Sequence, residues 1–186
     1  MVSTQVIGGV STMAAVFLFL AFVARHVGTW LQDTMFSNGD RFPTTLLLLD
    51  TNSTLSGERK QQIRIKLKAE FDVDLLNHTS DTAQSRQRIG EAVSHIRKKF
   101  FGKSGLVLQR NIEFGIAKNV AGGSIISLNV SLIIVVISFL ASMADLLYLG
   151  LIMLVFYVIL VVFGIVAMRT NARRYATILF EEYLAS

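Results

Sequence analysis

Three uncharged blocks dominate the pattern of hydrophobic and polar positions along the chain. They cover Val6–Ala24, Ile125–Ala144 and Leu146–Met168, which are 19, 20 and 23 residues long. A helix needs about 20 apolar residues to cross the hydrocarbon core of a bilayer. Each block is therefore predicted to be a transmembrane helix. Because only Asp145 and a few small residues separate the last two blocks, they are predicted to form a hairpin with a tight turn there.

The positions of the basic residues predict the orientation of these spans. Of the 18 Lys and Arg residues, one follows the first block, 14 lie between residues 41 and 118, and three follow the third block. Basic residues favour the cytoplasmic side of a membrane. The consistent topology places the N-terminus and the hairpin turn outside, and residues 25–124 and the C-terminus in the cytoplasm. Because Arg25 follows the first block and no basic residue precedes it, an anchor is favoured over a cleaved signal peptide.

The segment between the first two spans is predicted to be mostly helical. Ser56 caps a helix that carries Ile63, Leu67 and Phe71 on one face. Ser80 or Asp81 caps a second helix, whose apolar face is formed by Ile89, Val93, Ile96 and Phe100. Phe42–Thr45 is predicted to be extended because of Pro43, and residues 46–49 fit either a short strand or a helical turn. A short third element is expected at Leu106–Asn119.

These elements predict a mainly all-α integral membrane protein. It is predicted to have three transmembrane helices, with a small helical cytoplasmic insert between the first and the second in the chain. The predicted parts are the first transmembrane helix (1–28), a basic cytoplasmic domain (29–123), a transmembrane hairpin (124–168) and a cytoplasmic amphipathic tail (169–186) that extends the third span.

Composition and motifs argue against an enzyme. The chain has 52% hydrophobic residues, a mean hydropathy of +0.53 and no Cys, which excludes disulfides, thiolate nucleophiles and cysteine-based zinc sites. It contains no phosphate-binding loop, zinc-protease or serine-hydrolase motif. Asp72 and Asp74 would share a face only on a strand, and His95 fits a surface position. No catalytic residue, cofactor or metal site is expected.

The basic faces of the insert are candidate docking surfaces. Both predicted helices carry Lys and Arg, and the run RKKFFGK contributes Arg97, Lys98, Lys99 and Lys103. Such clusters attract phosphate in lipid headgroups or in nucleic acid. They also arise in cytoplasmic loops from topology alone. The candidate partners are therefore membrane lipids and a cytoplasmic protein or nucleoprotein regulator.

The second span carries hydroxyls at helical spacing, which indicates a helix-packing or pore face. These residues are Ser124, Ser127, Ser131, Ser138 and Ser142. Small hydroxyl residues let helices approach closely, and they also bond their own backbone. Three interpretations stay open, namely packing within the hairpin, a homo-oligomer interface and a water-lined pore. Asn129 lies off the stripe, so it would face another neighbour.

Short motifs between the membrane segments give a resemblance. They are Phe42-Pro43-Thr44-Thr45 with Leu47 and Asp50, then Leu55 and Lys60, then Ile112, Phe114, Gly115 and Asn119. In this order, over about residues 30–120, the chain resembles a set of small bacterial membrane proteins of phage-defence loci, including the two-span effectors of retrons. The chain departs from that set by its three spans.

The resemblance implies an antiviral effector, or toxin, that is held quiet by a cytoplasmic partner and damages the inner membrane once released. Together with the small-residue helix faces, it leads us to expect a self-associating protein of the bacterial inner membrane that permeabilises the membrane. The alternative is a non-toxic anchor or accessory subunit that docks a cytoplasmic complex.

Overall fold

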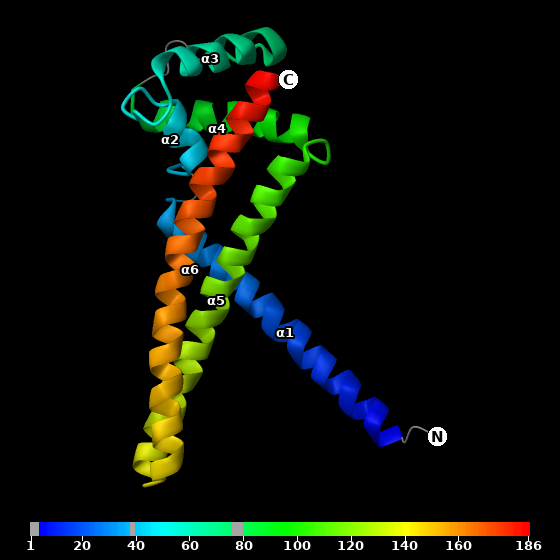
Figure 1. Cartoon of the computed structure of the whole chain (residues 1–186), viewed down its shortest axis with the longest axis vertical. Coiled ribbons are helices and arrows are strands. Elements are labelled where there is room, and N and C mark those ends of the chain that lie inside the picture. The colour runs from blue at the N-terminus through cyan, green and yellow to red at the C-terminus, as the bar shows by residue number, and fades with distance from the viewer. Residues whose placement is uncertain (1–3, 38–39, 76–79) are drawn as a thin grey trace. The chain divides into compact units, whose positions relative to one another are not determined.

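The chain folds into helices, and the described residues contain no strand. The computed structural model describes residues 4–37, 40–75 and 80–186, with the backbone alone for residues 4–10. In chain order the helices are α1 (Thr4–Met35), α2 (Pro43–Leu48), α3 (Gly57–Phe71), α4 (Ala83–Phe100), α5 (Gly105–Leu140) and α6 (Ala144–Ala185) (Figure 1).

Three of these helices are long and apolar enough to cross a membrane, as the sequence predicts. They are α1, α5 and α6, and the most apolar part of each lies in one of the three uncharged blocks. The chain is thus a multi-pass membrane protein of mainly helical fold. The predicted short element at 106–119 is not separate, because α5 runs without a break for 36 residues through Gly122 and Gly123. The predicted tail likewise continues the third span as part of α6, which has 42 residues.

The hairpin turns slightly earlier than predicted. Helix α5 ends at Leu140 and α6 begins at Ala144, so Asp145 lies in the first turn of α6 rather than in the connection. A carboxylate is stabilised there by the partial positive charge of a helix N-terminus. The reversal of the chain is made by Ser142, whose φ of 55° is left-handed.

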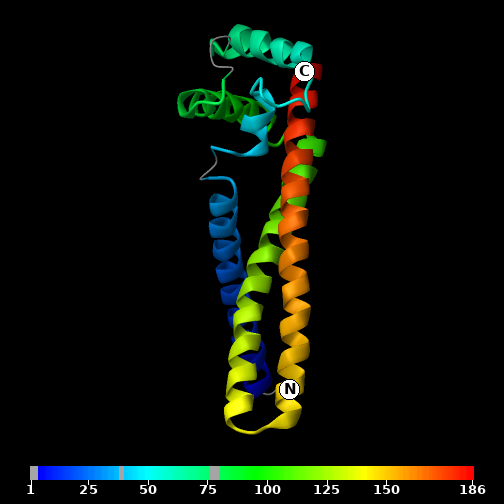
Figure 2. The same ribbon diagram turned by 90° about the vertical axis from the view of Figure 1, so that its left-hand side faces the viewer.

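The chain divides into two compact units. Unit 1 contains Met1–Leu31 and Ile116–Ala167, and unit 2 contains Gln32–Gly115 and Met168–Ser186. In unit 1, α5 and α6 lie side by side and are joined by the turn (Figures 1 and 2). Glycines allow this pairing, because a Cβ on Gly150 would lie 2.9 Å from Val135, and one on Gly164 would lie 2.9 Å from Ala121.

Helix α1 crosses α5 at a second glycine contact in unit 1. A Cβ on Gly122 would lie 2.2 Å from the carbonyl oxygen of Ala24 and 2.5 Å from the backbone nitrogen of Gly28. Beyond this crossing the N-terminal part of α1 diverges from the hairpin (Figure 1). Residues 11–22 of α1 are accordingly exposed on every side.

Unit 2 has its own apolar core, built from α2, α3, α4, the first turn of α5 and the last turns of α6. The side chains at its centre are at most 1% exposed, and they include Leu48, Ile63, Leu67, Ile89, Ile96, Leu179, Phe180 and Tyr183. The apolar faces predicted for residues 63–71 and 89–100 therefore point into this core. Phe71 and Phe100 pack at its edge.

The helix starts in unit 2 correct two predictions. Phe42 is extended, as predicted, but Pro43 begins helix α2, where its fixed φ and missing N–H suit the first helical position. The open choice for residues 46–49 is thereby settled as helix for Leu46–Leu48. Ser56 caps α3 as predicted, whereas α4 is capped by Thr82, not by Ser80 or Asp81, because the Thr82 hydroxyl accepts from the Ser85 N–H.

We expect Gly122→Ala to weaken the contact between α1 and α5. The new methyl group would collide with backbone atoms, which cannot move aside as a side chain can. Overpacking of this kind typically costs about 1–3 kcal/mol. Unfolding of the full chain by SDS in mixed micelles measures the loss. Gly123→Ala is the control, since its Cβ would lie 3.7 Å from that of Ala24, an ordinary contact. Equal stability of the two variants would contradict the proposed crossing.

Candidate functional site

A buried lysine bonds the segment that follows α2. Lys60 is 3% exposed, and its ammonium group donates to the carbonyl oxygens of Leu49, at 2.6 Å, and of Asn52. Removal from water lowers the pKa of Lys60 below its ordinary value, and the nearby Asp50 carboxylate opposes that shift. The carbonyls after a helix end lack partners within the helix. Lys60 donates to two carbonyls after α2 from its place on α3, and the Leu49 oxygen also accepts from the Asn52 N–H.

A second cation completes this arrangement. Arg64 lies one turn after Lys60 on α3 and is 8% exposed. It donates to the carbonyl oxygen of Leu48 at 2.7 Å and to the Asp50 carboxylate at 2.8 Å. Asp50 and Lys60, two residues of the short motifs that give the resemblance, thus lie close together near the end of α2. Their geometry favours a structural role, because each charge is engaged by groups of the same chain.

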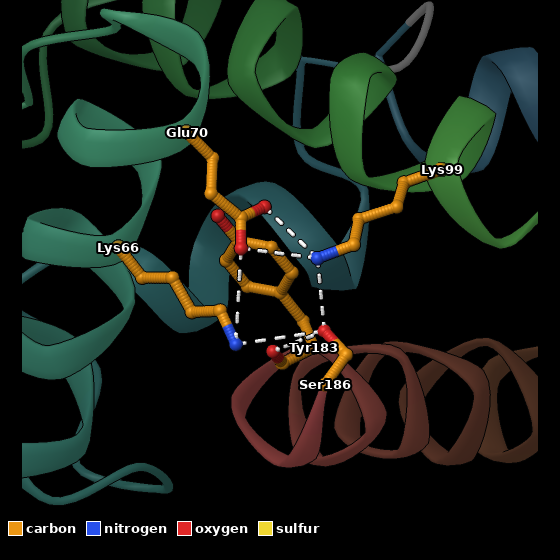
Figure 3. Close-up of polar contacts among 5 residues, drawn as sticks. All are labelled: Lys66, Glu70, Lys99, Tyr183 and Ser186. Carbon is orange, nitrogen blue, oxygen red and sulfur yellow. Dashed lines mark hydrogen bonds and ion pairs between the residues drawn. The ribbon is translucent and has the colours of Figure 1, made fainter.

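A second polar cluster joins α3, α4 and the end of α6 (Figure 3). The Glu70 carboxylate accepts from Lys99 at 2.9 and 3.0 Å and lies 3.9 Å from the Lys66 ammonium. Both ammonium groups lie over the Tyr183 ring, at 5.2 and 5.3 Å from its centroid. The hydroxyl of Ser186 lies 3.0 Å from the Lys99 ammonium. Tyr183 is therefore held at the end of α6 by two cations and one shared carboxylate.

The predicted basic docking set separates into two kinds of residue. Arg97 lies over the Phe42 and Tyr175 rings, 5.4 and 5.7 Å from their centroids, and Lys99 binds Glu70. Both are therefore engaged within unit 2. Lys98 and Lys103 are exposed and form no ion pair within the described part of the chain. Phe101, between them, is 89% exposed. Lys98, Phe101 and Lys103 form the outward-facing part of the predicted set.

The predicted serine face lies mainly within the hairpin. Ser131 and Ser138 are fully buried and Ser124 is 5% exposed. Each hydroxyl donates to the carbonyl oxygen four residues earlier, at 2.7–2.8 Å. Ser127 is only partly buried, and Ser142 lies outside the helix, in the turn. The burial of Ser124, Ser131 and Ser138 favours packing within the hairpin, because a pore lining would have to be open to water.

The other candidates show no site for chemistry. Asp72 has a left-handed φ of 55° and ends α3, and it pairs with Lys68 at 2.9 Å. His95 is exposed and stacks on Phe71 at 5.3 Å. Within residues 4–37, 40–75 and 80–186, no group of His, Asp and Glu side chains is arranged to hold a metal ion.

Sequence reasoning missed the inward-pointing charges and found the serine stripe. Nothing in the spacing of basic residues distinguishes Lys60 and Arg64, which are buried, from their exposed neighbours on α3. Glu70 also gave no signal, because its partners come from other helices. Comparison of the chain with family models, curated proteins and solved structures finds no match.

We expect Lys60→Met to destabilise unit 2. The substitution keeps the apolar stem but removes the ammonium donor from the Leu49 and Asn52 carbonyl oxygens, of which the Leu49 oxygen keeps the Asn52 N–H, a loss of about 1–3 kcal/mol. Faster hydrogen exchange in residues 43–67 of the full chain would report it. Lys98→Met, which changes an exposed lysine of α4, should leave exchange there unchanged. If both variants exchange like the wild type, the buried ammonium contributes no net stability.

Proposed function

We propose that this chain is an effector of the bacterial inner membrane that self-associates and permeabilises the membrane when triggered through unit 2. In this proposal the N-terminus and the hairpin turn lie outside, and unit 2 lies in the cytoplasm. The distribution of Lys and Arg supports this orientation.

The observation that carries the proposal is the continuity of α6. One helix without a break contains the third span and also supplies Tyr175, Leu179 and Tyr183 to the core of unit 2. A ligand that binds unit 2 differently in two states of its core therefore shifts the equilibrium between two states of α6. Such a direct connection suits a protein in which a cytoplasmic event controls a membrane event.

The surface of unit 2 supports the presence of a cytoplasmic partner. Lys98 and Lys103 present positive charge before and after the exposed Phe101 in the sequence. This combination suits an acidic protein, a nucleoprotein or anionic lipid headgroups. The resemblance of residues 30–120 to membrane effectors of phage defence extends the proposal to antiviral function, with the partner holding the effector quiet.

A passive anchor is the second candidate, and the serines favour it. Ser131 and Ser138 are buried inside one hairpin, and their hydroxyls bond carbonyls of their own helix. A single copy of the chain therefore needs no second copy to cover these polar groups in lipid. An anchor of this kind would dock a cytoplasmic complex through unit 2 without changing the permeability of the membrane.

The membrane potential of bacteria that express the full chain distinguishes these functions. We expect a voltage-sensitive dye to report depolarisation soon after induction. Depolarisation should be faster with Lys60→Met, because loosening unit 2 imitates its trigger, and unchanged with Arg88→Met, which changes an exposed arginine of α4 outside the docking set. If the wild type and Lys60→Met both insert into the membrane and neither depolarises the cells, the anchor is the better description.

A further inference from the structure

One polar side chain of the membrane helices lies outside every contact described so far. Asn129 is on α5, and its amide nitrogen donates to the carbonyl oxygen of Ile125 at 2.8 Å. The residue is exposed, and its amide oxygen accepts no hydrogen bond from the described residues. It differs in this respect from Ser131 and Ser138, which are buried and complete their hydrogen bonds within their own helix.

Asn129 lies deep in the apolar part of α5. Helix α5 ends at Leu140, and a rise of 1.5 Å per residue places Asn129 about 16 Å from that end. The hydrocarbon core of a bilayer is about 30 Å thick, so Asn129 falls near its middle. Water is scarce at that depth, and an amide without partners is costly there.

The side of α5 that carries Asn129 points away from α6. Successive residues of a helix are about 100° apart, so Asn129 and the buried Ser131 lie on nearly opposite sides. Val136 and Leu140 share the side of Asn129 and are 49% and 76% exposed. Gly122, where α1 crosses α5, lies on this side two turns before Asn129, and α1 diverges from α5 beyond that crossing. The exposed outer face of α5 past the crossing, formed by Asn129, Val136 and Leu140, is apolar except for one amide.

We propose that the outer face of α5 binds the same face of a second copy of the chain, with Asn129 of each copy bonded to Asn129 of the other. An amide carries both donors and an acceptor, so two identical amides satisfy each other across a two-fold axis. Hydrogen bonds between polar side chains stabilise the association of helices in membranes. This inference rests on the proposed function and names the residue through which its self-association occurs.

Cysteine cross-linking of the full chain in bacterial membranes tests the interface, because the chain contains no Cys of its own. Val136→Cys places a thiol on the outer face, two turns from Asn129, and leaves the amide in place. A disulfide needs Cβ atoms about 3.5–4.5 Å apart. We therefore expect an added oxidant to produce a dimer of twice the mass of the chain. Ile137→Cys is the matched control, since it is similarly exposed at 56% but points about 100° away.

The role of the amide is tested in the Val136→Cys background. Asn129→Leu should reduce the dimer fraction by roughly three- to twentyfold, the range expected for one hydrogen bond between membrane helices. Asn129→Gln, which keeps a donor and an acceptor, should restore most of it. Equal cross-linking of the Val136→Cys and Ile137→Cys variants, an Asn129→Leu variant that dimerises like its parent, or an adduct of another mass would each overturn the proposal.

The interface and the function can fail separately. If the dimer depends on Asn129 but no variant depolarises cells, the interface stands and the effector function falls. If depolarisation occurs and is the same for Asn129→Leu, the function stands and its dependence on this interface is refuted.

Discussion

The burial of the last turns of α6 is the interaction on which the rest of the structure depends. Leu179, Phe180 and Tyr183 lie at the centre of the unit 2 core, at most 1% exposed. Full burial of side chains of this size stabilises a fold by about 1.5–3 kcal/mol each. Without them the core that α2, α3 and α4 cover would lose its largest side chains, and Val107 at the start of α5 is too small to replace them. Helix α6, which is long and apolar enough to cross a membrane, therefore also supplies the centre of the unit 2 core.

The charges of unit 2 stabilise the same arrangement. Lys66, Glu70 and Lys99 form a cluster around the Tyr183 ring, and Lys60 and Arg64 bond to the chain after α2. Ion pairs that remain partly exposed contribute little each. Their effect here is geometric, because each charge links segments that are far apart in sequence. The basic character of the segment is thus in large part internal structure, and within the predicted docking set Lys98 and Lys103 are the residues that stay exposed and outside the ion pairs of the described chain.

Much of this fold could be predicted from the sequence, for identifiable reasons. The lengths of the uncharged blocks predicted the three spans, and the apolar spacing of Ile63 and Leu67 or of Ile89 and Ile96 predicted the inner faces of α3 and α4. What could not be predicted depends on tertiary neighbours. Four apolar residues at 46–49 carry no period, so helix and strand could not be separated. Lys60 is buried because carbonyl oxygens of the loop after α2 accept hydrogen bonds from its ammonium group. The periodicity of the sequence does not reveal such a tertiary contact.

The spacing of the polar residues on α5 predicts which of them share a face, but not which neighbour covers that face. Serine spacing predicted a face, but it could not decide between a neighbour in the same chain and one in another copy. The burial of Ser131 and Ser138 favours the same chain. A hydroxyl can bond the carbonyl four residues earlier, so a serine in lipid needs no outside partner. An amide has an additional donor and acceptor, and Asn129 uses only one donor on its own helix. On this ground we place the proposed contact with a second chain at Asn129, the residue off the stripe.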